Sequence, residues 1–463
     1  MPVSFFSEGR RLLLLALPLM VSQLAQTGMS FVDTVMAGRH NEVSLAAVAI
    51  ASSLWIPAFL TVTGILMAVT PIIAHANGAR RTGEIQHTIQ QALWLSLFVG
   101  VGFLILLRHL GGIFELLEME TAVRIQAQGY LEAVSWGIPA LAAFQVFRSL
   151  NEGFHQTRPY MYVSLAALLC NIPLNYILIY GKFGLPAMGG VGCGWATTTV
   201  IWLQLFLLVA HTLYNRTISA THWLADWQLP DREMLMAILR LGLPIGISIL
   251  IESSMFTLIA LFIAQLGATV VSGHQVAMSF ASLVFMIPLS FSIAITIRCG
   301  YTLGGNRPAQ ARAIGGMGII ITVATASISS TVMLLFPEQI ASLYTSSPQV
   351  KSLAMELLFL AGIFQFSDAV QISAAGALRG YKDTRFAFVV VLISFWGLGL
   401  PLGYTLGLTD FWGAPTGPQG FWTGLIAGLT LSALLLGGRF IHLSHKRIEM
   451  ADHCSTIGES PNI

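Results

Sequence analysis

The chain has 463 residues, of which 55% are hydrophobic and only 10% are charged, and its formal net charge is +2 at pH 7. Its mean hydropathy is +0.75. Soluble domains carry about 25% charged residues, so this composition excludes an ordinary soluble protein and predicts an integral membrane protein. We expect the lipid bilayer as a partner and no nucleic acid.

Apolar runs of about 20 residues recur from one end of the chain to the other, and each is long enough to cross a bilayer as an α-helix. The stretches between them are too short to hold a soluble domain. The runs predict an all-α protein with twelve transmembrane helices, at residues 12–37, 45–75, 88–112, 123–148, 160–181, 192–214, 236–264, 271–298, 312–336, 350–378, 386–407 and 420–440.

Basic residues predict the orientation of a multi-pass protein, because lysine and arginine concentrate in its cytoplasmic loops. With the N-terminus in the cytoplasm, eighteen of the 23 lysines and arginines fall on the cytoplasmic side. Sorted by loop, these eighteen include Arg148, Arg298 and Arg379, each assigned to a cytoplasmic loop. An even number of helices then places the C-terminus in the cytoplasm as well.

The first predicted helix carries a polar stripe in an otherwise apolar sequence. Ser22, Gln26, Met29, Ser30 and Asp33 follow one another at steps of three and four, so they share one helix face. In a bilayer such a face turns toward other helices or toward water. Asp33 is either a functional acid or a polar residue that marks the outer end of the helix.

The fifth predicted helix carries two amides, Asn171 and Asn175, one turn apart around Pro173. A proline leaves one backbone carbonyl of its helix without a donor, and nearby amides satisfy such a group. Two interpretations stay open, namely a site that coordinates a cation and a set of hydrogen bonds between helices. The GGVGCG sequence that follows indicates close helix packing, since a phosphate-binding loop needs a strand before it and a lysine.

The two halves of the chain repeat each other. Leu17-Pro18 matches Leu243-Pro244 at an offset of 226, and Thr157-Arg158 matches Thr384-Arg385 at an offset of 227. Since six helices is an even number, both copies have the same orientation, which makes the repeat parallel.

The most polar stretch between helices lies near the middle of the chain and separates the two halves. The sequence therefore predicts an N-terminal lobe of residues 1–214, a cytoplasmic linker of residues 215–235 and a C-terminal lobe of residues 236–463. The last of these ends in a short polar cytoplasmic tail.

The second half holds two acids within apolar helices. Asp368 has Gln365 and Gln371 three residues to either side, on its own helix face. Glu252 occupies the position that Gln26 holds in the first half. An unpaired charge at membrane depth is costly, so a functional role is favoured over a structural hydrogen bond. If the seventh and tenth helices face each other, the two acids form a coupled pair that binds H⁺ or Na⁺.

Nothing in the sequence indicates an enzyme. The histidines His75, His87 and His274 are scattered, and the cysteines show neither disulfide nor metal-ligand spacing. We expect no catalytic residues, no cofactor and no metal beyond Na⁺ at Glu252 and Asp368.

Four motifs together resemble the multidrug and toxic compound extrusion (MATE) family, in particular its NorM-type bacterial branch. They are QTGMSFVDTVMAG in the first helix, CNIPLNYILIYGKFG with GGVGCG, HQVAMSFASLVFMIP in the eighth helix and DAVQISAAGALRGYKD in the tenth. The resemblance spans nearly the whole chain. It implies two six-helix lobes around a central cavity.

The resemblance also implies functional residues. Glu252 and Asp368 match the cation-coupling carboxylates of the C-terminal lobe, and Asp33 belongs to a polar site of the N-terminal lobe. That site is supported by Asn171, Asn175 and Gln26. Some relatives carry a tyrosine where this chain has Phe364, so one hydroxyl is missing, which makes Na⁺ coordination less favourable and favours H⁺. Apart from the resemblance, methionine and aromatic faces adapt to varied apolar cations. The residues expected along the drug path on this ground are Met255, Phe256, Phe280, Phe285 and Phe364.

The function that the resemblance implies is export of cationic and amphiphilic drugs in exchange for Na⁺ or H⁺ by alternating access. We expect a monomer in the bacterial inner membrane. The alternative within transport is a flippase for lipid-linked oligosaccharides, which needs a strongly cationic cavity. Composition alone also permits a channel or a structural membrane protein.

Overall fold

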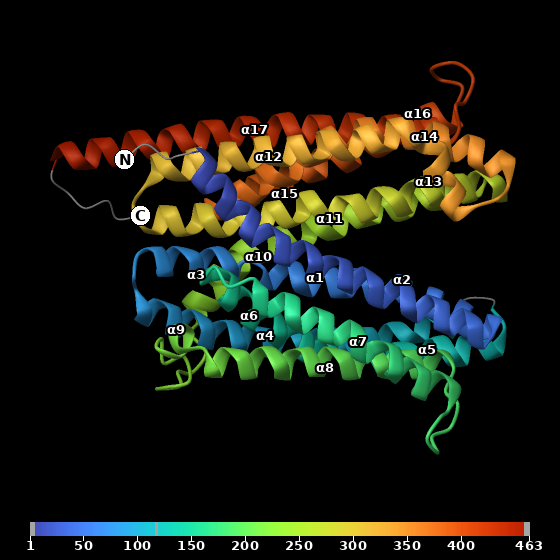
Figure 1. The fold of residues 1–463 in the computed structure, drawn as a ribbon, viewed down its shortest axis with the longest axis horizontal. Helices are drawn as coiled ribbons and strands as arrows, with labels where there is room; N and C mark the ends of the chain where they lie inside the picture. The colour runs from blue at the N-terminus through green and yellow to red at the C-terminus, as the bar shows by residue number, and fades with distance from the viewer. Residues whose placement is uncertain (1–4, 116–118, 458–463) are drawn as a thin grey trace. The chain divides into compact units, whose positions relative to one another are not determined.

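A computed structural model describes residues 5–115 and 119–457, and in these ranges its regular secondary structure is helical, without a strand (Figure 1). The last residues of the expected polar tail, 458–463, lie outside them. The helices are α1 (Phe5–His40), α2 (Glu42–Leu66), α3 (Val69–Gly78), α4 (Thr82–Leu110), η1 (Gly111–Glu115), α5 (Thr121–Ser135), α6 (Ile138–Gly153), α7 (Arg158–Tyr180), α8 (Gly190–Tyr214), α9 (Arg216–Ser219), α10 (Arg232–Ala264), α11 (Ala268–Gly304), α12 (Pro308–Leu335), α13 (Pro337–Tyr344), α14 (Pro348–Gly380), α15 (Thr384–Val391), the π-helix η2 (Leu392–Gly399), α16 (Leu400–Leu408) and α17 (Pro418–Ile457).

Local sequence explains where several helices begin and end. Asn41 precedes α2, and its side-chain oxygen accepts a hydrogen bond from the backbone N–H of Ser44 at 2.7 Å. Such a cap satisfies a donor that the first turn of a helix leaves free. At the other end of a span, α7 stops at Gly181, whose φ of 67° lies in the left-handed region that glycine adopts without steric cost.

Twelve membrane-spanning segments account for the fold. Eleven helical segments in the described part of the chain are long and apolar enough to cross a bilayer. The twelfth predicted span corresponds to α5 and α6, which run from residue 121 to residue 153 and are interrupted at Trp136 and Gly137. Each piece is shorter than a membrane-spanning helix, although the two together reach that length. The predicted twelve-helix, two-lobe architecture is confirmed.

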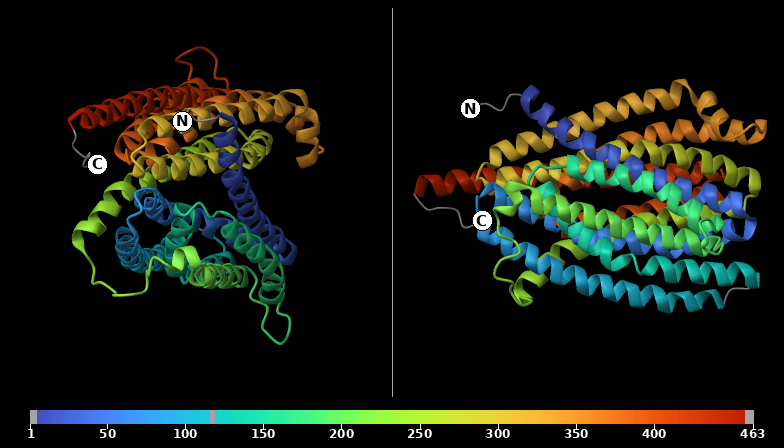
Figure 2. Two further views of the ribbon diagram at one scale, coloured as in Figure 1. Left: turned by 60° about the vertical axis from the view of Figure 1, so that its left-hand side comes forward. Right: turned by 60° about the horizontal axis from the view of Figure 1, so that its bottom comes forward.

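The chain forms two compact units, shown from two further directions in Figure 2. Unit 1 consists of Met1–Met20 and Ile247–Ile463, and unit 2 consists of Val21–Gly246. The sequence placed the boundary between the lobes at residues 215–235. The compact units divide the chain differently, because α1 and α10 each begin in one unit and continue in the other. Both helices pass from unit to unit two residues after a proline, Pro18 or Pro244.

The predicted linker is packed on unit 2. Side-chain amides of α4 hold it, since Gln90 donates to the carbonyl of Trp223 at 3.1 Å and Gln91 donates to the carbonyl of Leu229 at 2.9 Å. The side-chain oxygen of Gln91 in turn accepts from the backbone N–H of Asp231 at 2.7 Å. Residues 215–231 therefore form part of a compact unit.

Three buried arginines correct the assignment of basic residues to loops. Arg148, Arg298 and Arg379 lie inside α6, α11 and α14, and each is less than a tenth exposed. Each has a polar partner within its own unit. Arg148 Nε contacts Glu152 at 2.7 Å, Arg298 contacts Glu8, and Arg379 donates to the Ser292 hydroxyl. Such partners allow a guanidinium to be buried.

Close helix packing at Gly192 gives a first prediction. A Cβ atom at this position of α8 would lie within 3.0 Å of the Leu178 carbonyl and the Ile179 nitrogen of α7. We expect Gly192→Ala to lower the free energy of unfolding by about 1–3 kcal/mol, because backbone atoms must shift to admit the methyl group. Chemical unfolding in detergent measures this loss. Gly102→Ala is the control, since no described atom beyond its chain neighbours and its own helix backbone lies within 4 Å of its Cβ position. An equal loss there would contradict the packing argument.

Candidate coupling sites

The first site surrounds Asp33 of α1, within unit 2. Asp33 Oδ1 accepts hydrogen bonds from the side-chain nitrogens of Asn171, at 3.0 Å, and Asn175, at 2.6 Å. Asp33 Oδ2 accepts a third hydrogen bond from the Thr197 hydroxyl of α8 at 3.2 Å. The carboxylate is buried, and its three donors satisfy it as an anion. The sequence prediction that Asp33, Asn171 and Asn175 belong together agrees with this geometry.

Oxygen atoms collect around this carboxylate. Asn175 donates to Asn171 Oδ1 at 3.1 Å, while the buried Asn175 Oδ1 has no partner among the described residues. An unsatisfied buried acceptor is costly and can bind an entering proton donor or cation. Thr197 was not predicted, because a threonine in the run Thr197–Thr199 has no sequence feature that separates it from its neighbours.

Gln26 lies in a second network of unit 2. Its side-chain nitrogen donates to the Tyr160 hydroxyl at 2.9 Å, and the guanidinium of Arg148 lies 4.2 Å from the centre of the Tyr160 ring. Arg148 contacts Glu152, which also accepts from the Thr70 hydroxyl at 3.0 Å. Gln26 was expected to support Asp33, but its described hydrogen bond joins it instead to a buried ion pair.

The second site surrounds Asp368 of α14, within unit 1. Its side chain is only 1% exposed, and its Oδ2 atom has no hydrogen-bond partner in the described ranges. Gln365 is fully buried, and neither atom of its amide group has a described partner. The Oε1 atom of Gln371 is also buried without a hydrogen-bond partner among the described residues. A cluster of unsatisfied buried polar atoms on one helix face is costly, and it suits water, a proton or a cation.

Glu252 of α10 is the charged neighbour of Asp368. The two carboxylates interact electrostatically as like charges, whereas Arg379 acts on Glu252 with the opposite sign. Glu252 itself is partly buried. Asp33 differs from Asp368, because three donors surround Asp33, whereas Asp368 interacts electrostatically with a second carboxylate.

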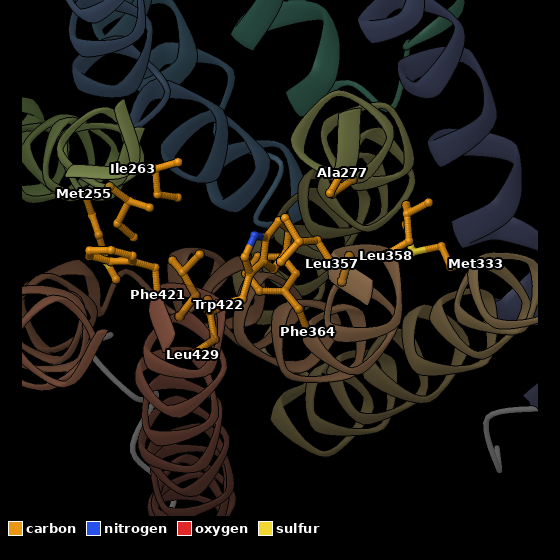
Figure 3. Packing of buried hydrophobic residues seen from close by; sticks show 14 of the residues in the cluster. Met255, Ile263, Ala277, Met333, Leu357, Leu358, Phe364, Phe421, Trp422 and Leu429 are labelled. Carbon is orange, nitrogen blue, oxygen red and sulfur yellow. The ribbon is translucent and has the colours of Figure 1, made fainter. Parts of the chain in front are cut away.

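The expected drug-path residues of unit 1 divide into two groups (Figure 3). Met255 and Phe364 belong to the buried apolar core, where the Phe364 ring packs edge-on against Trp422 at 5.9 Å between centroids. Phe256 and Phe280 are partly buried and pack against this core, and Phe285 is also partly buried. Phe364 thus contributes a packed ring one turn before Asp368.

No group of three or more His, Cys, Asp or Glu side chains gathers among the described residues. His274 is buried in unit 1 and accepts a hydrogen bond at 3.3 Å from the Trp422 indole. His87 contacts Asp231 of the packed linker at 3.2 Å.

Two parallel six-helix repeats with buried carboxylates define a class of protein, namely a multi-pass membrane transporter. The chain belongs to the MatE family, whose model matches residues 18–177 and again residues 244–405. The double match covers more than half of the chain and reproduces the internal repeat. The protein is a transporter and not an enzyme.

Curated relatives resemble the chain over nearly its whole length. It is 44% identical over 444 residues to the "Probable multidrug resistance protein NorM" of Shewanella oneidensis, covering 96% of this chain and 97% of the relative. It is 43% identical to the multidrug resistance protein PmpM of Pseudomonas aeruginosa, with 96% and 95% covered. The resemblance to the MATE family and its NorM branch is thereby confirmed.

Solved structures agree on the fold. The eukaryotic MATE transporter AtDTX14 matches with a TM-score of 0.84 at 21% identity, covering 96% of this chain and 99% of that chain. A MATE structure described as the bent conformation matches with a TM-score of 0.86 at 20% identity, covering 96% and 97%.

Proposed function

We propose that this protein exports cationic and amphiphilic drugs across the bacterial inner membrane in exchange for H⁺ or Na⁺, by alternating access. The drug class rests on relatives of 42–44% identity that are named multidrug resistance proteins. Ion coupling rests on the buried Asp368 oxygen, which lacks a partner among the described residues, and on the electrostatic interaction of Asp368 with Glu252. Termini on the cytoplasmic side and a monomeric state are further parts of the proposal.

The two acid sites differ in how readily they can bind a coupling ion. Asp33 is held by three donors, so a cation or proton that enters must compete with existing hydrogen bonds. Asp368 has an open oxygen and a neighbouring carboxylate, and binding one positive charge there relieves the repulsion between them. We therefore assign the main coupling role to Glu252 and Asp368 and a second role to Asp33 with its amides.

H⁺ is the favoured coupling ion. Sodium needs a shell of several oxygen ligands, and the ring of Phe364, which packs against Trp422, offers none. A proton needs only one carboxylate oxygen. In the proposed cycle, ion entry from outside neutralises the pair and lowers drug affinity, the drug leaves outward, and ion release inward restores the pair. Each ligand shifts the equilibrium only by its difference in affinity between the states.

The flippase alternative finds no support in the buried basic residues. A site for a lipid-linked pyrophosphate needs guanidinium groups that are available to the ligand. Arg148, Arg298 and Arg379, the three buried arginines of the described chain, are engaged with Glu152, Glu8 and the Ser292 hydroxyl.

Counterflow in proteoliposomes tests the proposal. Vesicles containing purified protein and ethidium are given either an H⁺ gradient at constant Na⁺ or a Na⁺ gradient at constant pH. We expect saturable ethidium movement that responds to the H⁺ gradient, because a proton satisfies the Asp368 oxygen without further ligands. Ethidium fluorescence with DNA on the receiving side reports the rate.

Protein-free vesicles and a gradient-free sample are the controls for leakage. A response to Na⁺ alone would overturn the choice of ion but keep the antiport. Ethidium movement that ignores both gradients, or does not saturate, would contradict antiport and indicate a channel.

A further inference from the structure

The two units end in matching loops that carry exposed aromatic side chains. Loop 181–189 joins α7 to α8 in unit 2, and loop 409–417 joins α16 to α17 in unit 1. Phe183 in the first loop is 89% exposed, and Phe411 and Trp412 in the second are 77% and 65% exposed. Large aromatic side chains exposed to water are unfavourable, so their presence in both repeats indicates contact with an apolar environment.

Backbone hydrogen bonds show that the loops are equivalent. In the first, the N–H groups of Met188 and Gly189 donate to the carbonyls of Leu178 and Ile179 at 3.1 and 3.2 Å. In the second, Thr416 and Gly417 donate to the carbonyls of Leu406 and Gly407 at 3.0 and 3.1 Å. The glycine that closes each loop, Gly189 or Gly417, has a positive φ. The same offset of 228 relates all these positions and pairs Phe183 with Phe411.

The direction of the loops indicates their surroundings. In Figure 1 loop 409–417 projects sideways from the ends of α16 and α17, transverse to the helix axes. Loop 181–189 projects in the same manner from the ends of α7 and α8. A loop that followed the helix axes would carry its tip into water. These loops stay at the level of the helix ends, where a membrane-spanning segment gives way to the lipid headgroups.

We infer that the two loops are anchors in the interfacial layer of the phospholipid bilayer, with Phe183, Phe411 and Trp412 inserted among headgroups and upper acyl chains. Aromatic residues concentrate at this level of membrane proteins, where an apolar ring meets a hydrated layer. Beside loop 181–189 the exposed face continues along α7, because Leu169, Ile172 and Tyr176 are also exposed at steps of three and four. The surface of this loop is thus continuous with the exposed face of a membrane-spanning helix.

Each loop follows the fifth span of its own six-span repeat. One anchor belongs to each unit, so each unit carries its own attachment to the interface. This inference rests on the membrane-spanning fold and does not depend on the proposed drug or coupling ion.

Spin labels test the depth of the loops while leaving the aromatic rings in place. Leu185→Cys and Ala414→Cys, each exposed in its loop, are labelled in full-length protein whose native cysteines are replaced. The protein is placed in nanodiscs of phosphatidylcholine and phosphatidylglycerol. We expect both labels to collide more with oxygen, which partitions into lipid, than with a water-soluble nickel chelate. The reference is a label at Ser219→Cys, an exposed position between α8 and α10.

A second substitution links the depth to the rings. Phe183→Ser and Phe411→Ser, added to the respective labelled proteins, should move the labels toward the reference value, while Phe411→Tyr should not. Labels as accessible to nickel as the Ser219→Cys reference would overturn the inference, because the loops would then lie in water. Dipolar coupling between labels on separate copies would also overturn it, since the rings would then meet a second protein.

Discussion

Asp368→Asn is expected to reduce gradient-driven ethidium exchange by about 5–150-fold, the range of a typical coupling free energy between two ligands. The amide keeps the size of the carboxyl group but cannot take up a proton, so the gradient loses its binding site. Drug binding in the absence of a gradient should change less, because asparagine has nearly the size and shape of aspartate. Exchange rates in proteoliposomes and ethidium binding by fluorescence anisotropy, measured together, separate the two effects.

Glu356→Gln is the matched control for this substitution. Glu356 lies on the same helix, α14, but is exposed and accepts a hydrogen bond from Gln419 at 2.8 Å. It should keep normal exchange. Glu252→Gln should resemble Asp368→Asn, since the two carboxylates interact. Wild-type exchange in both Asp368→Asn and Glu252→Gln would sink the assignment of the coupling pair.

The sequence predicted the fold well because hydropathy and repetition are properties of whole segments. Twelve apolar runs and an offset of about 226 residues are visible without any knowledge of packing. The compact units were harder to predict, because the exchange of half-helices at Pro18 and Pro244 depends on which surfaces pack together. The loop assignment of Arg148 was wrong for a related reason. Its partner Glu152 lies one turn away, and only burial distinguishes this pair from an exposed one.

The candidate sites also show that sequence patterns do not reveal which side chains on different helices pack together. Asp33, Asn171 and Asn175 could be grouped from the sequence because polar residues are rare in these helices. Thr197 completes the site from another helix, and threonine is too common in membrane helices to stand out. Gln26 was grouped with Asp33 because they share a face of α1, yet its neighbour on α7 is Tyr160. Helix periodicity gives the face of a residue and leaves its partner undetermined.

Arg148→Met is expected to cause the largest loss of stability, about 3–5 kcal/mol, because it leaves Glu152 as a buried charge without its basic partner. Arg148 is 5% exposed and Glu152 is 1% exposed, so water cannot replace the guanidinium. Methionine retains much of the side-chain volume, which keeps packing changes small. Unfolding of the purified protein in mixed detergent micelles, followed by circular dichroism, gives the free energy of unfolding.

Two further variants separate a buried charge from a general loss of packing. In Arg148→Met/Glu152→Leu both charges are absent, and most of the lost stability should return because no isolated ion remains. Arg439→Met removes the partner of Asp383, at 2.7 Å, from a pair that is partly exposed. That change should cost under about 1 kcal/mol, since solvent screens the charge that remains. An equal loss of unfolding free energy in Arg148→Met and Arg439→Met would contradict this account. Glu152 would then not remain as an isolated anion in Arg148→Met, and its network with Tyr160 and Gln26 would have to accept a neutral carboxyl group.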